Sequence, residues 1–174
     1  MERKTTVITP EQLRRQQDFC GKIRAWWERR GRVPTAFVDT YGCQQNEADS
    51  ERIRGMLEQC GYTMQGEEEG ADVVVINTCA VREHAEQRVF GNVGALVHTK
   101  RRHPDQKIFL CGCMMGQPQV AEKIKKSYVH VDGVFSTHHL WEFPQLLYGV
   151  LRTGKRVFAT ADEAGSIAEG LPVT

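Results

Sequence analysis

Three of the six cysteines occupy the same kind of position, each just after an apolar run that is typical of a buried β-strand. Cys43 follows the run 36–38, Cys79 follows the run 72–76, and Cys113 follows the run 107–110. The intervals from 43 to 79 and from 79 to 113 each fit one β-α unit or two short ones. Because ligands bind at the carboxyl ends of strands in open parallel sheets, three such loops could bring three thiolates to one point. The pattern therefore predicts a metal or cluster site.

Cysteine thiolates favour zinc or iron–sulfur clusters. A structural zinc usually binds cysteines in pairs spaced by about two to four residues, whereas Cys43, Cys79 and Cys113 come singly and far apart. A 4Fe-4S cluster held by three thiolates suits this wide spacing and leaves a fourth iron open to sulfur or a substrate. A nucleophilic cysteine would instead need a neighbouring base, and His84 is the only candidate near these thiols in the sequence.

The remaining cysteines have a different context. Cys20 and Cys60 lie on the apolar faces of expected helices, so we expect both to be small core residues away from the site. Cys111 stands two residues before Cys113, and we expect it to be a core or near-site neighbour because side chains alternate faces along a strand. The adjacent pair His138-His139 is expected at the surface.

The elements that position these residues alternate between strands and helices. Thr9, Pro10 and Gln12 predict a capped helix over 10–30 with the apolar stripe Leu13, Cys20, Ile23 and Trp27. Asn46 is expected to cap the next helix, which ends at Gly61. Further expected strands cover 62–64, 72–76, 107–110 and 132–135, and further helices cover 82–103, 118–126 and 138–149.

This alternation predicts a three-layer α/β fold with a five-stranded, mainly parallel sheet, flavodoxin-like or Rossmann-like, and an extra amino-terminal helix. In the strand order 2-1-3-4-5, the strands that precede Cys43, Cys79 and Cys113 lie side by side. We expect an amino-terminal helical extension over 1–34, the cluster-binding domain over 35–150 and a linker over 151–174.

Composition sets broad limits on function. The 174 residues carry a net charge of +1, which gives no strong electrostatic case for binding nucleic acid or a membrane surface. No apolar run approaches the roughly 20 residues of a membrane span, and the first residues lack the apolar core of a signal peptide. We therefore expect a cytoplasmic protein with reduced cysteines.

Three motifs resemble the amino-terminal domain of the radical S-adenosylmethionine methylthiotransferases. They are Tyr41-Gly42-Cys43-Gln44-Gln45-Asn46 with Asp49-Ser50-Glu51, Asn77-Thr78-Cys79-Ala80-Val81-Arg82-Glu83, and Gly112-Cys113-Met114. The run Ala80-Val81-Arg82-Glu83 resembles the tRNA 2-methylthio-adenosine synthase branch more than the branch that modifies a ribosomal-protein aspartate. The resemblance implies that Cys43, Cys79 and Cys113 hold an auxiliary 4Fe-4S cluster, and that Cys111 replaces a residue that is usually glycine.

The resemblance also implies a reaction for the larger enzyme, in which a methylthio group is added to carbon 2 of an isopentenylated adenosine beside the anticodon of tRNA. Such enzymes need a second 4Fe-4S cluster and S-adenosylmethionine in a radical domain. No Cys-x3-Cys-x2-Cys triplet occurs in these 174 residues, so we expect a domain of a longer enzyme that is inactive alone. We expect tRNA to be bound by the full-length enzyme and only weakly by this domain.

Other functions remain open at this stage. The chain could be a zinc-stabilised or cluster-stabilised α/β interaction module without chemistry. It could belong to a methylthiotransferase that acts on a ribosomal-protein aspartate or on another modified adenosine. A flavodoxin-like binder of small ligands is disfavoured, because the loop Thr40-Tyr41-Gly42-Cys43-Gln44 has a single glycine and no phosphate-cradling pattern.

Overall fold

The computed structural model describes residues 9–41, 44–78 and 83–159. In chain order, these residues form α1 (Pro10–Arg29), β1 (Thr35–Thr40), α2 (Gln44–Gln59), β2 (Thr63–Met64), β3 (Val73–Thr78), α3 (Glu83–Arg102), β4 (Lys107–Gly112), η1 (Cys113–Gly116), α4 (Pro118–Ser127), β5 (Gly133–Phe135), η2 (Thr137–Glu142), α5 (Phe143–Thr153) and β6 (Val157–Ala159).

Within the described ranges, the strands form one six-stranded sheet in the order β2-β1-β3-β4-β5-β6, and every neighbouring pair is parallel. The predicted α/β class and the order of the first five strands are confirmed. The predicted number of five strands was wrong, because β6 adds a parallel edge strand beside β5. This strand begins after Gly154, whose left-handed φ of 71° ends α5, and it lies in the range expected to be a linker.

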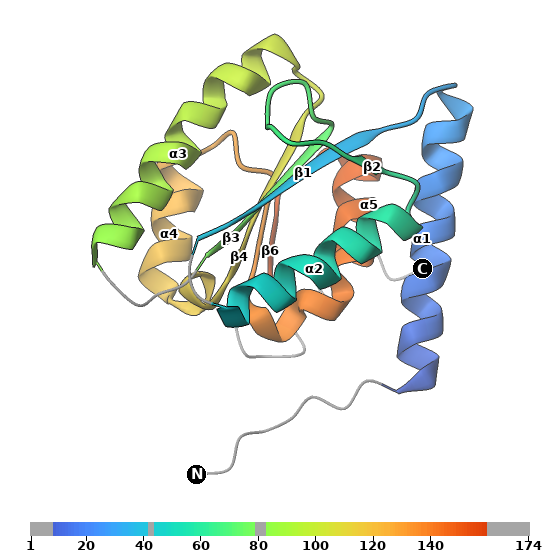
Figure 1. Ribbon diagram of the computed structural model, residues 1–174, viewed down its shortest axis with the longest axis horizontal. Helices are drawn as coiled ribbons and strands as arrows, with labels where there is room; N and C mark the ends of the chain where they lie inside the picture. Colours follow the sequence, from blue (N-terminus) through green and yellow to red (C-terminus); the bar gives the residue numbers. More distant parts are fainter. Residues whose placement is uncertain (1–8, 42–43, 79–82, 160–174) are drawn as a thin grey trace.

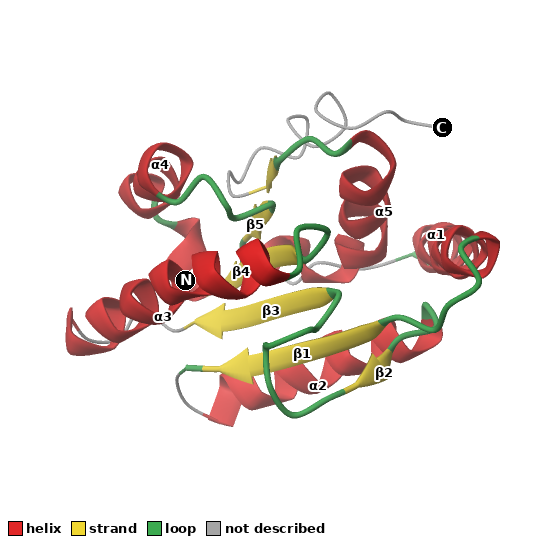
Figure 2. Cartoon of the chain, turned by 90° about the horizontal axis from the view of Figure 1, so that it is seen from above, coloured by secondary structure: helices red, strands yellow, loops and turns green. Residues whose placement is uncertain are grey.

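Helices cover both faces of the sheet. In Figure 1, α3 and α4 lie on the left of the strands, and α2, α5 and α1 lie on the right. Figure 2 shows the same separation from above, with the sheet between α3 and α4 on one side and α5 and α1 on the other. Each face has its own apolar core, and all six residues of β3 are buried. A central parallel strand buried on both faces reads as a continuous apolar run, which is why the sequence predicted it well.

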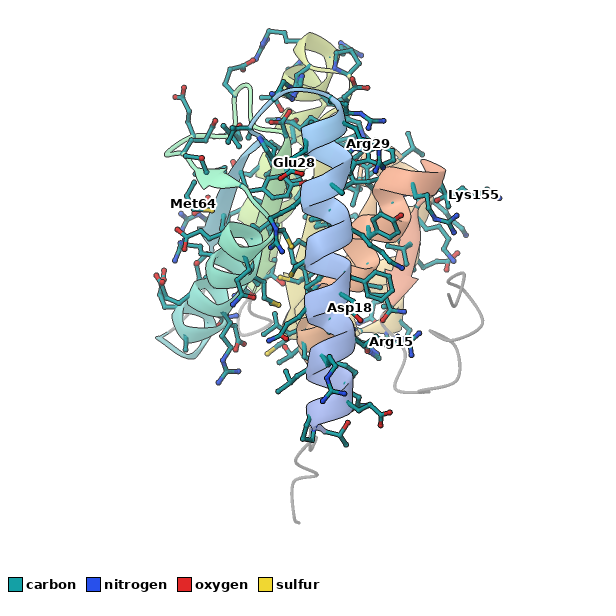
Figure 3. All side chains as sticks on the ribbon, turned by 90° about the vertical axis from the view of Figure 1, so that its right-hand side faces the viewer. Arg15, Asp18, Glu28, Arg29, Met64 and Lys155 are labelled. Atoms are coloured by element: carbon teal, nitrogen blue, oxygen red, sulfur yellow. The ribbon has the colours of Figure 1, made fainter. Side chains whose placement is uncertain are left out.

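Helix α1 packs on the face of α2 and α5. Its capping box at Thr9 and Gln12 is confirmed, and its buried positions are Gln16, Phe19, Cys20, Ile23 and Trp27. Figure 3 looks onto this helix, which runs between α2 and α5 with Arg15, Asp18, Glu28 and Arg29 on its outer side. The expectation that Leu13 joins the buried stripe was wrong, because its exposed fraction is 49%.

Polar contacts fix how α1 lies against the domain. The side chain of Gln16 donates to Gln145 Oε1 at 3.1 Å and accepts from the backbone N–H of Gln145 at 3.1 Å. The indole N–H of Trp27 donates to Tyr62 Oη at 2.9 Å. Because these groups are buried, each bond satisfies polar atoms that would otherwise be desolvated without a partner.

Two local expectations were wrong. Asn46 does not cap α2, because the helix already begins at Gln44 and the Asn46 side chain is buried beside β3. His139 is not at the surface, because η2 turns it inward, where its Nδ1 lies 3.1 Å from Glu142 Oε2. The expected helix over 138–149 is divided into η2 and α5.

In the described part of the chain, no helix is long and apolar enough to cross a membrane.

Replacing Ile23 by Ala should lower the free energy of unfolding by about 2–5 kcal/mol, because the side chain has no exposed surface and its removal leaves a cavity under α1. Leu13→Ala on the same helix is the matched control, and it should change stability by less than about 0.5 kcal/mol because Leu13 is half exposed. Urea unfolding measures both variants. Equal losses in the two would contradict the placement of α1.

Candidate metal centre

Strands β1, β3 and β4 end together at one edge of the sheet. Thr40 pairs with Asn77 across β1 and β3, and Thr78 pairs with Gly112 across β3 and β4. The backbone N–H of Tyr41 extends this pairing by donating to the carbonyl of Asn77 at 2.7 Å. The three strand ends lie in the lower left of the sheet in Figure 1. The predicted side-by-side arrangement of these strands is confirmed.

Of the three predicted ligands, only Cys113 lies among the described residues; Cys43 and Cys79 lie outside them. Cys113 begins η1 directly after Gly112, and its side chain is exposed. The Thr137 hydroxyl donates to Cys113 Sγ at 3.8 Å. Among the described residues, no group of three or more His, Cys, Asp or Glu side chains could hold a metal ion. The convergence of Cys43, Cys79 and Cys113 therefore stays a prediction.

Gly112 sets how closely β3 and β4 approach at their ends. Its φ is 108°, a backbone conformation that residues with a side chain rarely adopt. A Cβ at this position would lie 2.1 Å from the Thr78 carbonyl oxygen and 2.7 Å from Asn77 Oδ1. The backbone therefore turns sharply against the end of β3 just before Cys113, and only glycine fits there.

A buried polar cluster, here called the amide network, lies beneath this edge. Asn46 Nδ2 donates to the Thr78 carbonyl at 2.7 Å, and Asn77 Nδ2 donates to the Asn46 carbonyl at 2.8 Å and to Ser50 Oγ at 3.0 Å. The Ser50 and Thr40 hydroxyls are 2.6 Å apart. These bonds join the start of α2 to the ends of β1 and β3. The network was not predicted from the sequence, although Asn46 and Asn77 both lie in the motifs around Cys43 and Cys79.

Cys111 differs from Cys113 in ways that matter for metal binding. Its side chain has no exposed surface, and burial, with a further contribution from the charge of Asp49, raises the pKa of its thiol far above the usual value. A thiol that is fully buried in the core in this way is not presented to a group at the edge of the sheet. Its carbonyl accepts a hydrogen bond from the Thr78 hydroxyl at 2.8 Å. The expectation that Cys111 is a core neighbour of the site is confirmed.

The remaining cysteines and the polar residues considered near the site lie in different places. Cys20 and Cys60 are buried in the core between α1 and α2, as expected. The side chain of His84 lies outside the described part of the chain. Near Cys113, the Ser136 hydroxyl is buried and has no hydrogen-bond partner among the described residues. Ser136 directly precedes Thr137, so this buried hydroxyl belongs to the same edge of the sheet.

Fold and edge together define a class of protein: a doubly wound, all-parallel α/β domain with a cysteine-bearing loop at the carboxyl edge of its central strands. The chain belongs to the uncharacterized protein family UPF0004, whose profile matches residues 35–136. The matched range contains β1 to β5 and all three predicted ligands, and it does not include α1.

Several curated relatives carry the name tRNA-2-methylthio-N(6)-dimethylallyladenosine synthase. The protein from Alkaliphilus oremlandii is 44% identical over 98% of this chain and 36% of its own length. The protein from Clostridioides difficile is 43% identical over the same shares, and that from Natranaerobius thermophilus is 49% identical over 76% of this chain and 30% of its own length. These matches confirm the resemblance given by the motifs. The chain spans about a third of the length of these relatives.

Replacing Gly112 by Ala should lower the free energy of unfolding by more than about 2 kcal/mol, because the new Cβ would overlap backbone atoms of Thr78 and the φ would be strained. Gly55→Ala is the matched control. No atom lies within 4 Å of its new Cβ, so Ala should stabilise α2 by about 0.5–1 kcal/mol. Urea unfolding should therefore show a lower free energy of unfolding for Gly112→Ala and a higher one for Gly55→Ala. An unchanged free energy of unfolding in Gly112→Ala would contradict the close approach of β3 and β4.

Proposed function

We propose that this chain is the domain of a tRNA methylthiotransferase that holds an auxiliary 4Fe-4S cluster through Cys43, Cys79 and Cys113. The observation that carries the proposal is the common edge of β1, β3 and β4. In the sequence, Cys113 directly follows Gly112, Cys79 directly follows Thr78, and Cys43 comes three positions after Thr40. Each proposed ligand therefore adjoins the end of one of three neighbouring strands.

The relatives suggest the substrate. Their name describes a 2-methylthio product on a dimethylallyl adenosine of tRNA. By similarity, the whole enzyme would add a methylthio group to carbon 2 of isopentenylated adenosine beside the anticodon. The radical cluster and S-adenosylmethionine would then belong to the two thirds of the relatives' length that this chain does not span. A cytoplasmic location, and weak binding of tRNA by this domain alone, are part of the same proposal.

The described residues near Cys113 fit a thiolate ligand. Its exposed sulfur can reach a group outside the strand, and the Thr137 hydroxyl supplies a hydrogen bond to that sulfur. Hydrogen bonds to ligating sulfurs help to set the reduction potential of a cluster. The buried, partnerless Ser136 hydroxyl is a further polar atom at this edge. When bound, a 4Fe-4S cluster with three protein ligands leaves one iron open to bind sulfur.

The rest of the edge would hold the ligands in position. The amide network fixes the first turn of α2, which follows Cys43 in the sequence, against the end of β3, which precedes Cys79. The bonds are made by neutral amides and hydroxyls and join the described residues on either side of the proposed ligands. Cys111 is buried in the core and Cys113 is exposed, so of these two cysteines only Cys113 is proposed as a ligand.

A zinc-stabilised α/β interaction module is the second candidate, because zinc also binds three thiolates and a fourth ligand. Metal analysis separates the two candidates. After anaerobic reconstitution with iron and sulfide, a cluster domain should contain iron and acid-labile sulfide in equal amounts. A zinc module should bind zinc alone and retain no sulfide.

Replacing Cys113 by Ala should remove most of the reconstituted iron and sulfide, because two thiolates hold a 4Fe-4S cluster poorly. Cys43→Ala and Cys79→Ala should behave in the same way. The matched control is Cys111→Ala, two residues away in the sequence, which should retain the wild-type iron content while losing some stability to a small cavity. Equal iron contents in Cys113→Ala and Cys111→Ala would contradict the ligand assignment.

The reconstituted 174-residue chain should release no 5′-deoxyadenosine from S-adenosylmethionine under a strong reductant, because it has no Cys-x3-Cys-x2-Cys triplet to hold a radical cluster. A full-length relative such as the Clostridioides difficile protein serves as the positive control. Chromatography of the quenched reaction measures the product. If the chain alone forms more 5′-deoxyadenosine than a sample without protein, the proposal that the radical cluster lies outside these 174 residues is wrong.

A further inference from the structure

Two cysteines outside the proposed cluster site lie in contact with each other. Cys20 belongs to α1, and Cys60 follows the last residue of α2. Their sulfur atoms are 3.1 Å apart, and the Cys60 thiol donates a hydrogen bond to Cys20 Sγ. A disulfide bond is about 2.05 Å long, so the two sulfurs need to approach by only about 1 Å to be joined.

The surroundings of the two thiols are unequal. The hydrogen bond from Cys60 lowers the pKa of Cys20, and the positive charge of Arg24 lowers it further. Burial acts in the opposite direction and raises this pKa, but the net shift is downward. The same hydrogen bond raises the pKa of Cys60, and burial raises it further. Arg24 is fixed close to the pair, because its guanidinium donates to the carbonyl of Gln59. Cys20 is therefore the nucleophile of the pair, and Cys60 keeps its proton.

A cavity gives a small molecule access to Cys20. Its volume is about 680 Å³, and it lies between α1, α2 and η2. Cys20 is part of its wall, together with Gln16, Met56 and Gln59, whereas Cys60 is not among the residues that line it. Cys20, with an exposed fraction of 3%, therefore borders the cavity, whereas Cys60, with an exposed fraction of 1%, does not.

We propose that Cys20 and Cys60 are a peroxide-sensitive thiol pair whose oxidation forms a disulfide between α1 and the end of α2. The Cys20 thiolate attacks one oxygen of hydrogen peroxide; the O–O bond breaks, giving a sulfenic acid and a hydroxide that takes up a proton to become water. The Cys60 sulfur then attacks Cys20 Sγ, the S–S bond forms, the S–O bond breaks, and water leaves with the Cys60 proton. In total, two thiols lose two electrons and one peroxide is reduced to two waters.

The disulfide would act on the attachment of α1. This helix lies outside the range 35–136 that defines the family, and it is held by buried apolar contacts and by the hydrogen bonds of Gln16 and Trp27. A covalent link between residues 40 positions apart would restrict the unfolded chain and hold α1 on the domain. The proposal concerns neither Cys43, Cys79 nor Cys113, so it stands or falls independently of the cluster.

Peptide mapping tests the bond directly. The reduced 174-residue chain is treated with hydrogen peroxide in the presence of a metal chelator, alkylated, and digested with trypsin and a glutamate-specific protease. The expected fragments 16–22 and 59–67 each contain one cysteine. They should appear joined, with a mass two hydrogens below their sum, and the joined species should disappear on reduction. Oxidation should also raise Tm by roughly 5–10 °C in a reductant-reversible manner.

Single variants test the order of the steps. In Cys60→Ser, the serine hydroxyl can still donate to Cys20 Sγ but cannot form a disulfide, so dimedone should label Cys20 after peroxide treatment. In Cys20→Ala, Cys60 should stay unlabelled, and Cys111→Ala should form the joined peptide as the wild type does. Wild-type chain that yields no joined peptide while Cys20 is oxidised alone would overturn the proposal. So would Cys60 labelling in Cys20→Ala that matches Cys20 labelling in Cys60→Ser.

Discussion

The close approach of β3 and β4 at Gly112 is the constraint on which the carboxyl edge depends. Since no Cβ fits between Gly112 and the Thr78 carbonyl, the two strand ends come together without an intervening side chain. The same carbonyl accepts a hydrogen bond from the Asn46 side chain, so the first turn of α2 is joined to this strand end. One residue without a side chain thus allows the ends of β3 and β4 to approach this closely.

The two ends of the sheet are built with different chemistry. At the amino end, the buried Asp72 carboxylate accepts from the backbone N–H of Thr35 and pairs with Arg32, and Asp132 accepts from the N–H of Ile108 and pairs with Lys100 at 2.6 Å. At the carboxyl end, the amide network makes its bonds with neutral groups. Ion pairs therefore join neighbouring elements at the amino end, whereas neutral amides and hydroxyls join α2 to β3 at the carboxyl end.

Much of this arrangement could be predicted from local sequence patterns. The continuous apolar run at 72–76 and the capping box at Thr9 fixed their elements, since each signal is local and strong. The inward position of His139 and the role of Asn46 could not be predicted, because both depend on partners brought together only by the folded sheet. The edge strand β6 was missed because three residues after a glycine-ended helix carry too little periodicity to indicate a strand.

The mutual hydrogen bonds of Gln16 and Gln145 join residues 129 positions apart, and this separation has a consequence for synthesis on the ribosome. Helix α1 emerges early, but α5, whose Tyr148 packs on Phe19, is made much later. At about 5–20 residues per second, the apolar stripe of α1 waits for several seconds without its partner. The apolar face of α1 therefore stays without this partner on the nascent chain until α5 has been made.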